Sequence, residues 1–273
     1  MAGFTDAREE VTLLAMLADA TNTQLELLSA DRHLTHIDEQ SAGWAAGVRL
    51  ICDVDDTLFA SINEPVYPGG ARYPGALAFV ARCGQTRGRP VTILTARPEG
   101  QGGVLEDRLR RELDARGVAA ATVLSGRALW LLGHEAMAAG KAINLAHLMA
   151  LHPVDSFVLV GDSGQGDVAL ARQALDAWPT RIVAVFIHLV NPSLTTLKSG
   201  ELDHPDSRIV FFGTYVEAAR KALSLGLMSQ SDVAAVGAEA RSELAGIAFD
   251  TPAQAVAAQT AMKIALSSAT IRS

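Results

Sequence analysis

A chain of 273 residues in which 49% are hydrophobic and 19% are charged can form a large buried core, which excludes an intrinsically disordered protein. The formal net charge of −7 disfavours nucleic acids and anionic membrane surfaces as partners, because both repel a negatively charged chain. Two cysteines, Cys52 and Cys83, are too few for a disulfide framework and indicate a reducing compartment. The sequence shows no secretory signal pattern, and no apolar run approaches the roughly 20 residues that span a bilayer. We therefore expect a cytoplasmic protein without a transmembrane segment.

The first part of the chain has a helical pattern. Apolar residues recur at helical spacing through residues 5–31, so residues 1–46 are expected to form an N-terminal helical extension. Beyond it, five runs rich in β-branched residues are continuous rather than alternating, which is typical of strands covered on both faces of a parallel sheet. The predicted strands are 48–53, 90–95, 156–161, 181–187 and 208–212. Helical patterns lie between several of them, at 104–117, 129–150 and 167–178.

The alternation of strands and helices predicts an α/β fold with a doubly wound parallel sheet of about five strands. We expect residues 47–215 to form this core. The remainder, residues 216–273, is Ala-rich and predicts a C-terminal helical segment. Either terminal extension could lie against a membrane as an amphipathic helix, but packing on the edge of the sheet is the favoured interpretation.

Polar side chains follow the predicted strands at their carboxyl ends, where a doubly wound sheet binds its ligands. Asp53 ends the first strand in the stretch "ICDVDDTLF", and the two-residue period of a strand places Asp55 on the same side. Thr95 ends the second strand. The third strand leads into "GDSGQGD", which carries Asp162 and Asp167. The sequence therefore predicts that four carboxyl groups gather at one edge of the sheet.

Four carboxylates in one pocket require positive charge, since each pair repels by roughly 1 to 4 kcal/mol at 4 Å in water-like to surface-like surroundings. Lys141, in the helical pattern before the third strand, supplies one positive charge. A set of oxygen ligands favours a hard cation, and Mg²⁺ fits best because it combines a few carboxylates with waters and phosphate oxygens. No cluster of histidine and cysteine has the spacing of a zinc site.

The stretches "DVDDT" and "LTAR", a following lysine and "GDSGQGD" resemble, in this order, the four motifs of the haloacid dehalogenase (HAD) superfamily of phosphohydrolases. Within that superfamily, "GDSGQGD" followed by "WPTRIVAVFIHLV" is similar to the catalytic domain of the actin-patch-associated phosphatidate phosphatases. The resemblance covers residues 48–215. It implies a HAD-like Rossmannoid core with a small cap domain or none.

The resemblance also implies a role for each matching residue. Asp53 would be the nucleophile, and Asp55 the general acid and base. Thr95 and Lys141 would bind the phosphoryl oxygens. The enzyme implied is a phosphoric monoester hydrolase that forms an aspartyl-phosphate intermediate.

A metal site completes the motif set. The resemblance implies that Asp53, Asp162 and Asp167 bind Mg²⁺ through their side chains and that Asp55 binds it through its backbone carbonyl. Two neighbouring residues have no motif role. Asp56 is expected to cap a loop, and Arg97 either binds a second anionic group or forms a surface salt bridge.

The substrate follows less directly from the sequence. The 37 residues between Thr57 and Thr95, and the 45 between Thr95 and Lys141, are too few for a full cap domain. A lightly covered site suits a large phosphorylated group, so the first hypothesis is a Mg²⁺-dependent phosphatase that acts on phosphatidate or another lipid phosphate, with peripheral membrane contact. A soluble phosphomonoesterase for a small metabolite is the second hypothesis. A catalytically silent module that binds a partner is the third, and the complete set of motif residues disfavours it.

Overall fold

The computed structural model describes residues 47–61, 65–83, 91–98, 111, 114–115, 120–126, 134–190 and 207–267. Within these residues, six parallel strands form one sheet in the order β3-β2-β1-β4-β5-β6. The strands are β1 (Val48–Cys52), β2 (Val91–Pro98), β3 (Ala120–Gly126), β4 (Ser156–Asp162), β5 (Ile182–His188) and β6 (Ile209–Phe212). The order reverses direction next to β1, so the carboxyl ends of β1 and β4 flank the point where a doubly wound sheet binds ligands.

The predicted doubly wound α/β fold is confirmed, but the sheet contains one strand more than the five expected. The missed strand is β3, which pairs with β2 at one edge of the described sheet. Its sequence, AATVLSG, begins with two alanines and ends with serine and glycine. These residue types have low strand propensity, and the short central run was therefore not recognised.

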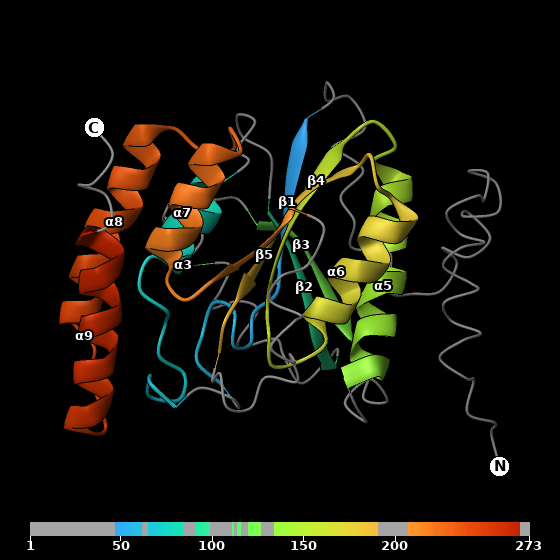
Figure 1. The fold of residues 1–273 in the computed structure, drawn as a ribbon. Coiled ribbons are helices and arrows are strands. Elements are labelled where there is room, and N and C mark those ends of the chain that lie inside the picture. Colours follow the sequence, from blue (N-terminus) through green and yellow to red (C-terminus); the bar gives the residue numbers. More distant parts are fainter. Residues whose placement is uncertain are drawn as a thin grey trace, which may run out of the picture.

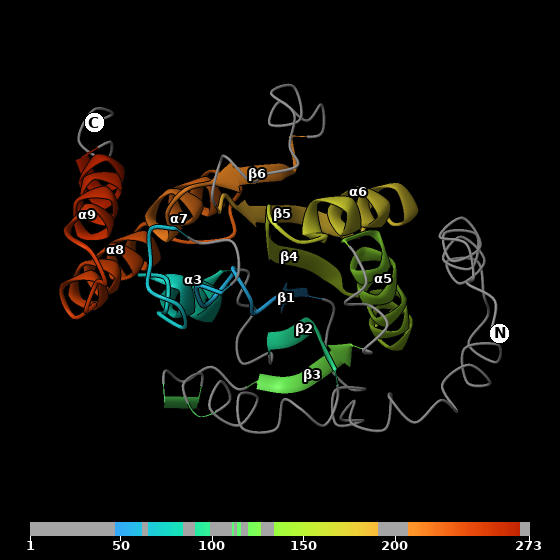
Figure 2. The ribbon, with the colours of Figure 1, turned by 90° about the horizontal axis from the view of Figure 1, so that it is seen from below.

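Helices cover both faces of the sheet (Figures 1 and 2). One face is covered by α3 (Ala76–Arg82) and α7 (Tyr215–Ser224), and the other by α5 (His134–Leu151) and α6 (Asp167–Ala177). Successive strand residues point to opposite faces, so that Leu50 and Cys52 join the α3 and α7 side while Ile51 joins the α5 and α6 side. This two-sided burial explains why the strand sequences are continuously apolar.

The C-terminal segment is helical, as its pattern predicts. Helices α8 (Gln230–Ala245) and α9 (Pro252–Ser267) lie outside α7 and away from the sheet (Figure 2). They pack through a small buried cluster that joins Val216 of α7, Ala240 of α8 and Met262 of α9. Capping boxes fix the starts of α7 and α8.

Several predictions are not tested by this structure. The N-terminal helical extension lies outside the described residues, as does most of the helix predicted at 104–117. The domain limits 1–46, 47–215 and 216–273 therefore stay predictions. In the described part of the chain, no helix combines the length and the apolar character needed to cross a membrane.

Candidate active site

Asp53 stands at the carboxyl end of β1 with both side-chain oxygens engaged. Its backbone N–H donates to the carbonyl of Val160 in β4 at 2.9 Å, which continues the sheet register through this residue. The hydroxyl of Thr57 donates to Oδ2 of Asp53 at 3.3 Å, and Nζ of Lys141 donates to Oδ1 at 2.8 Å. Because Asp53 is buried, these two donors define the orientation of its carboxylate.

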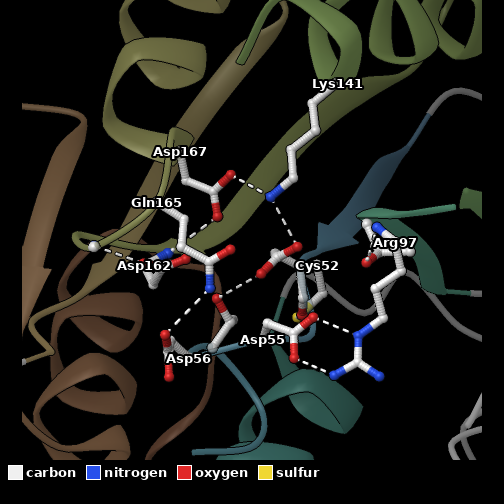
Figure 3. Close-up of polar contacts among 12 residues, drawn as sticks. Cys52, Asp55, Asp56, Arg97, Lys141, Asp162, Gln165 and Asp167 are labelled. Atoms are coloured by element: carbon white, nitrogen blue, oxygen red, sulfur yellow. Dashed lines mark hydrogen bonds and ion pairs between the residues drawn. The ribbon is translucent and has the colours of Figure 1, made fainter. Parts of the chain in front are cut away.

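Lys141 crosses from α5 to the cluster and is buried along its whole length. Its Nζ donates to Asp53 and also to Oδ1 of Asp167, at 2.6 Å (Figure 3). A buried lysine is tolerated only when it is paired. Lys141 therefore joins a carboxylate that follows β1 to one at the start of α6.

Asp162 is the last residue of β4 and Asp167 is the first residue of α6, on either side of the connecting loop. The backbone N–H of Asp162 donates to Oδ2 of Asp167 at 3.2 Å, and the N–H of Gly164 donates to Oδ1 of Asp162 at 2.6 Å. The other oxygen of Asp162, Oδ2, is buried without a hydrogen-bond partner among the described residues. An unpartnered buried carboxylate oxygen is costly, so this atom is a natural ligand for a cation.

One ligand oxygen from each of Asp53, Asp162 and Asp167 lies within 4.8 Å of the other two. When all three carboxylates are ionised, the ammonium of Lys141 leaves a net charge of −2. A divalent cation would neutralise this charge, and the donors are the oxygen type that Mg²⁺ prefers. The donor set therefore fits the predicted metal.

A cavity of about 20 Å³ adjoins this cluster on the α5 and α6 side of the sheet. Asp53, Lys141 and Asp167 line part of its wall, and apolar residues such as Leu159 and Ile187 line the rest. A cavity of this size has room for about one water molecule. It is too small for a phosphoester substrate.

Electrostatics within the cluster oppose ionisation of its acids. Burial raises the pKa of Asp53 from its usual value of 3.8 to about 7; Lys141 opposes this rise and Asp167 adds to it. Burial, together with Asp167 and Asp53, raises the pKa of Asp162 well above its usual value. Burial alone would lower the pKa of Lys141, but Asp167 and Asp53 outweigh it and raise that pKa. Lys141 is thus charged throughout the neutral range. Its single charge does not balance the three carboxylates.

Gly161, the residue before Asp162, is required by the approach of Asp167. A Cβ at this position would lie 2.4 Å from Oδ2 and 2.6 Å from Cβ of Asp167. We predict that Gly161→Ala displaces Asp167 and lowers stability by about 1 to 3 kcal/mol, as overpacking does. Thermal unfolding measures the effect. Gly246→Ala is the control, because a Cβ there makes only ordinary contacts; equal melting temperatures for the two variants would contradict this prediction.

Asp55 does not join the three-carboxylate group through its side chain. Instead, Nε of Arg97 donates to Oδ2 of Asp55 at 2.5 Å, and Nη2 of Arg97 donates to Oδ1 (Figure 3). That Asp55 and Asp53 serve one reacting centre stays a prediction, and the salt bridge shows only how the Asp55 side chain is held here. β1 ends at Cys52, so the two-residue period of a strand does not extend to residue 55. Of the two roles expected for Arg97, the structure shows the salt bridge. The pair is only partly exposed and is therefore not fully at the surface.

Thr95 is buried near the carboxyl end of β2, where the sequence placed it. Its hydroxyl oxygen accepts the backbone N–H of Arg97 at 3.2 Å. This bond lies where the register of β2 against β3 shifts, between Leu94 and Pro98. The phosphoryl-binding role of Thr95 stays a prediction.

Asp56 caps the loop after β1, as expected, but its position is more constrained than a surface cap. It is fully buried and has a positive φ of 56°, a strained conformation for a residue other than glycine. Its Oδ1 accepts the backbone N–H of Ser61 at 2.7 Å, and its Oδ2 accepts the side-chain amide of Gln165 at 3.2 Å. The contact with Gln165 joins the loop after β1 to the loop between β4 and α6.

Two supporting residues were missed by sequence reasoning. Nδ1 of His188, at the end of β5, hydrogen-bonds the carbonyl of Asp56 at 2.9 Å, and the hydroxyl of Tyr215 donates to the carbonyl of Thr57 at 2.7 Å. Burial lowers the pKa of His188. Both residues follow the loop by more than 100 positions in the sequence, and no local pattern indicates these contacts.

Comparison with known families agrees with the motif resemblance. Residues 74–189 match the family model described as "Phosphatidate phosphatase APP1, catalytic domain". No curated protein and no solved structure matches the chain. The matched segment includes Thr95, Lys141, Asp162 and Asp167, whereas Asp53 precedes it. The match supports a phosphatase and hence a hydrolase.

Proposed function

Starting from the match of residues 74–189 to a phosphatidate phosphatase catalytic domain, we propose that the chain is a Mg²⁺-dependent phosphatase with an aspartyl-phosphate intermediate on Asp53. The substrate class proposed is phosphatidate or another lipid phosphate. The observation that carries the proposal is the buried group of three carboxylates around Lys141, with one oxygen of Asp162 lacking a partner.

The metal would be held by the carboxylates of Asp53, Asp162 and Asp167. When bound, a divalent ion supplies the positive charge that lets an anionic carboxylate approach an anionic phosphoryl group. The unpartnered oxygen of Asp162 and the net charge of the cluster both support this assignment.

The residues of the chain would divide the reaction between them. An oxygen of Asp53 attacks phosphorus and the bond to the leaving oxygen breaks, which splits one difficult step into two easier ones. Lys141 and Thr57 hold the Asp53 carboxylate in a fixed orientation before the attack. Asp55 gives a proton to the leaving oxygen and later takes one from the water that hydrolyses the phosphoenzyme. Thr95 would bind a phosphoryl oxygen.

Phosphate release from p-nitrophenyl phosphate and from phosphatidate in mixed micelles, each with and without Mg²⁺, tests this proposal. Metal-dependent release from both substrates is expected. Turnover of soluble esters with none of phosphatidate would favour the small-metabolite enzyme. No metal-dependent turnover on any phosphoester would overturn the proposal and favour a silent binding module.

The pKa of Asp53 predicts how pH and metal affect stability together. Its pKa is about 7 in the folded protein and near 3.8 when unfolded, so the folded state binds the proton more tightly. Stability from this group is therefore complete below pH 3.8 and is lost as the pH rises through 7. Mg²⁺ competes with that proton, so we predict a larger Mg²⁺-induced rise in melting temperature at pH 8 than at pH 5.5.

Differential scanning fluorimetry at the two pH values measures this rise. Asp162→Asn is the matched variant, because it removes the charge from the unpartnered oxygen while keeping the side-chain shape. The variant should lose most of the response to Mg²⁺. An equal rise at both pH values in the unmodified protein would contradict the prediction.

Other expectations from the sequence stay proposals. A cytoplasmic location rests on the two cysteines, both of which are free and buried. A substrate that is a lipid phosphate implies peripheral contact with a membrane, and no nucleic-acid partner is proposed.

A further inference from the structure

A salt bridge to Arg97 engages the carboxylate of Asp55, which the proposed reaction uses as its general acid and base. Both carboxylate oxygens of Asp55 accept hydrogen bonds from the guanidinium, one from Nε and one from Nη2. Each oxygen of Asp55 therefore already has one donor on Arg97. An oxygen that gives a proton to a leaving group must first carry that proton, and it cannot carry it in the line of a guanidinium N–H, so at least one of the two bonds must open in each turnover.

Arg97 differs from Lys141 in its access to solvent. Its side chain is 39% exposed, while that of Lys141 is 2% exposed. Lys141 is also committed to two buried carboxylates, Asp53 and Asp167. Among the described residues, Arg97 has a single carboxylate partner, and this partly exposed ion pair is easier to open than the buried contacts of Lys141.

A phosphoryl group can replace Asp55 as that partner. Guanidinium binds phosphate oxygens through the same two-pronged geometry that it uses for a carboxylate, and a phosphoryl group carries more negative charge. Arg97 follows Thr95 on β2, and Asp55 follows Asp53 after β1, so the pair lies at the ends of two adjacent strands. A phosphoester attacked by Asp53 would thus arrive beside the Arg97 side chain.

We propose that Arg97 is a substrate-exchanged latch: it holds Asp55 in the substrate-free protein and transfers to the phosphoryl group when substrate binds, which releases Asp55. This inference rests on the proposed phosphatase function. It assigns to Arg97 both recognition of the phosphoryl group and control of when Asp55 becomes available. The exchange forms and breaks only hydrogen bonds and an ion pair, and no covalent bond changes.

Calorimetric titration with inorganic phosphate in saturating Mg²⁺ tests the exchange. Arg97→Ala is expected to weaken phosphate binding by roughly 10- to 100-fold, the range of charge-assisted hydrogen bonds. Arg97→Lys should recover part of the affinity, because it keeps the charge but not the fork. The Michaelis constant for p-nitrophenyl phosphate should rise with the loss of phosphate affinity. Arg82→Ala, at the end of α3, is the control and should change neither value.

A double-mutant cycle separates the latch from a simple positioning role. If phosphate competes with Asp55 for Arg97, then Asp55→Asn should tighten phosphate binding by about 2- to 5-fold, and this gain should vanish in the Arg97→Ala background. An equal gain in both backgrounds would overturn the latch. So would an Arg97→Ala variant with reduced kcat but unchanged phosphate affinity and Michaelis constant.

Failure of the latch can be told from failure of the proposed function. Should the unmodified protein turn over phosphoesters while Arg97→Ala retains its phosphate affinity and Michaelis constant, only the latch fails. Should the unmodified protein neither bind phosphate nor hydrolyse any phosphoester, both proposals fail.

Discussion

Asp53→Asn is expected to lower phosphatase turnover by at least about 1,000-fold, because an amide cannot act as the attacking group. The fold should survive this change. Asparagine keeps the side-chain shape, its carbonyl oxygen can still accept a hydrogen bond from Lys141 or Thr57, and one of the mutually repelling carboxylates is removed. The melting temperature without metal should therefore be unchanged or higher.

Steady-state hydrolysis of p-nitrophenyl phosphate and thermal unfolding give the two readouts. Asp176→Asn is the matched control, because it makes the same chemical change at an exposed position of α6. It should retain full activity. An Asp53→Asn enzyme with near-normal turnover and an intact fold would exclude Asp53 as the nucleophile.

Lys141→Met carries the second large expected effect, on stability as well as activity. The substitution keeps the length of the side chain but removes the ammonium that contacts both Asp53 and Asp167. Breaking a buried ion pair by removing one partner typically costs about 3 to 5 kcal/mol. We expect a loss of this size near pH 8 and a smaller loss near pH 5, where Asp53, with its pKa of about 7, is protonated.

Denaturant unfolding at the two pH values measures this loss. Lys221→Met, on the exposed side of α7, makes the same replacement without a buried partner and should be close to neutral. A Lys141→Met protein as stable at pH 8 as the unmodified chain would show that the carboxylates do not depend on this charge.

The sheet was predictable because its strands are buried on both faces. Strands such as β4 and β5 are continuous apolar runs, and this signal does not depend on distant parts of the chain. The gathering of Asp53 and Asp162 then follows from topology, since the carboxyl ends of β1 and β4 are adjacent. β3 gave a weaker signal because alanine, serine and glycine make up most of its length.

The orientation of Asp55 was not predictable from strand periodicity. The chain leaves the sheet after Cys52 and turns sharply, with Leu58 N–H donating to Val54 at 2.8 Å and Asp56 in a left-handed conformation. A turn of this kind places each side chain according to its own dihedral angles. The partner of Asp55 is also 42 residues away, where β2 departs from regular register before Pro98. Such a long-range ion pair leaves no trace in local sequence.

Lys141 shows the opposite case. Nothing in its helical pattern distinguishes it from a solvated lysine, and only the resemblance to an ordered motif set indicated its role. The structure places its ammonium between Asp53 and Asp167, and its phosphoryl-binding role stays a prediction. The physical reason is burial: a lysine of a core-facing helix is retained there because the carboxylates of Asp53, after β1, and Asp167, at the start of α6, neutralise it.

Trapping of the covalent intermediate tests the central claim most directly. The protein is mixed with a ³²P-labelled phosphoester and Mg²⁺, quenched in acid within the first turnover, digested with a protease and analysed by mass spectrometry. We predict a phosphoryl group on Asp53, absent when Mg²⁺ is omitted and absent from Asp53→Asn. Full turnover without label on the chain, or label on a residue other than Asp53, would contradict the account.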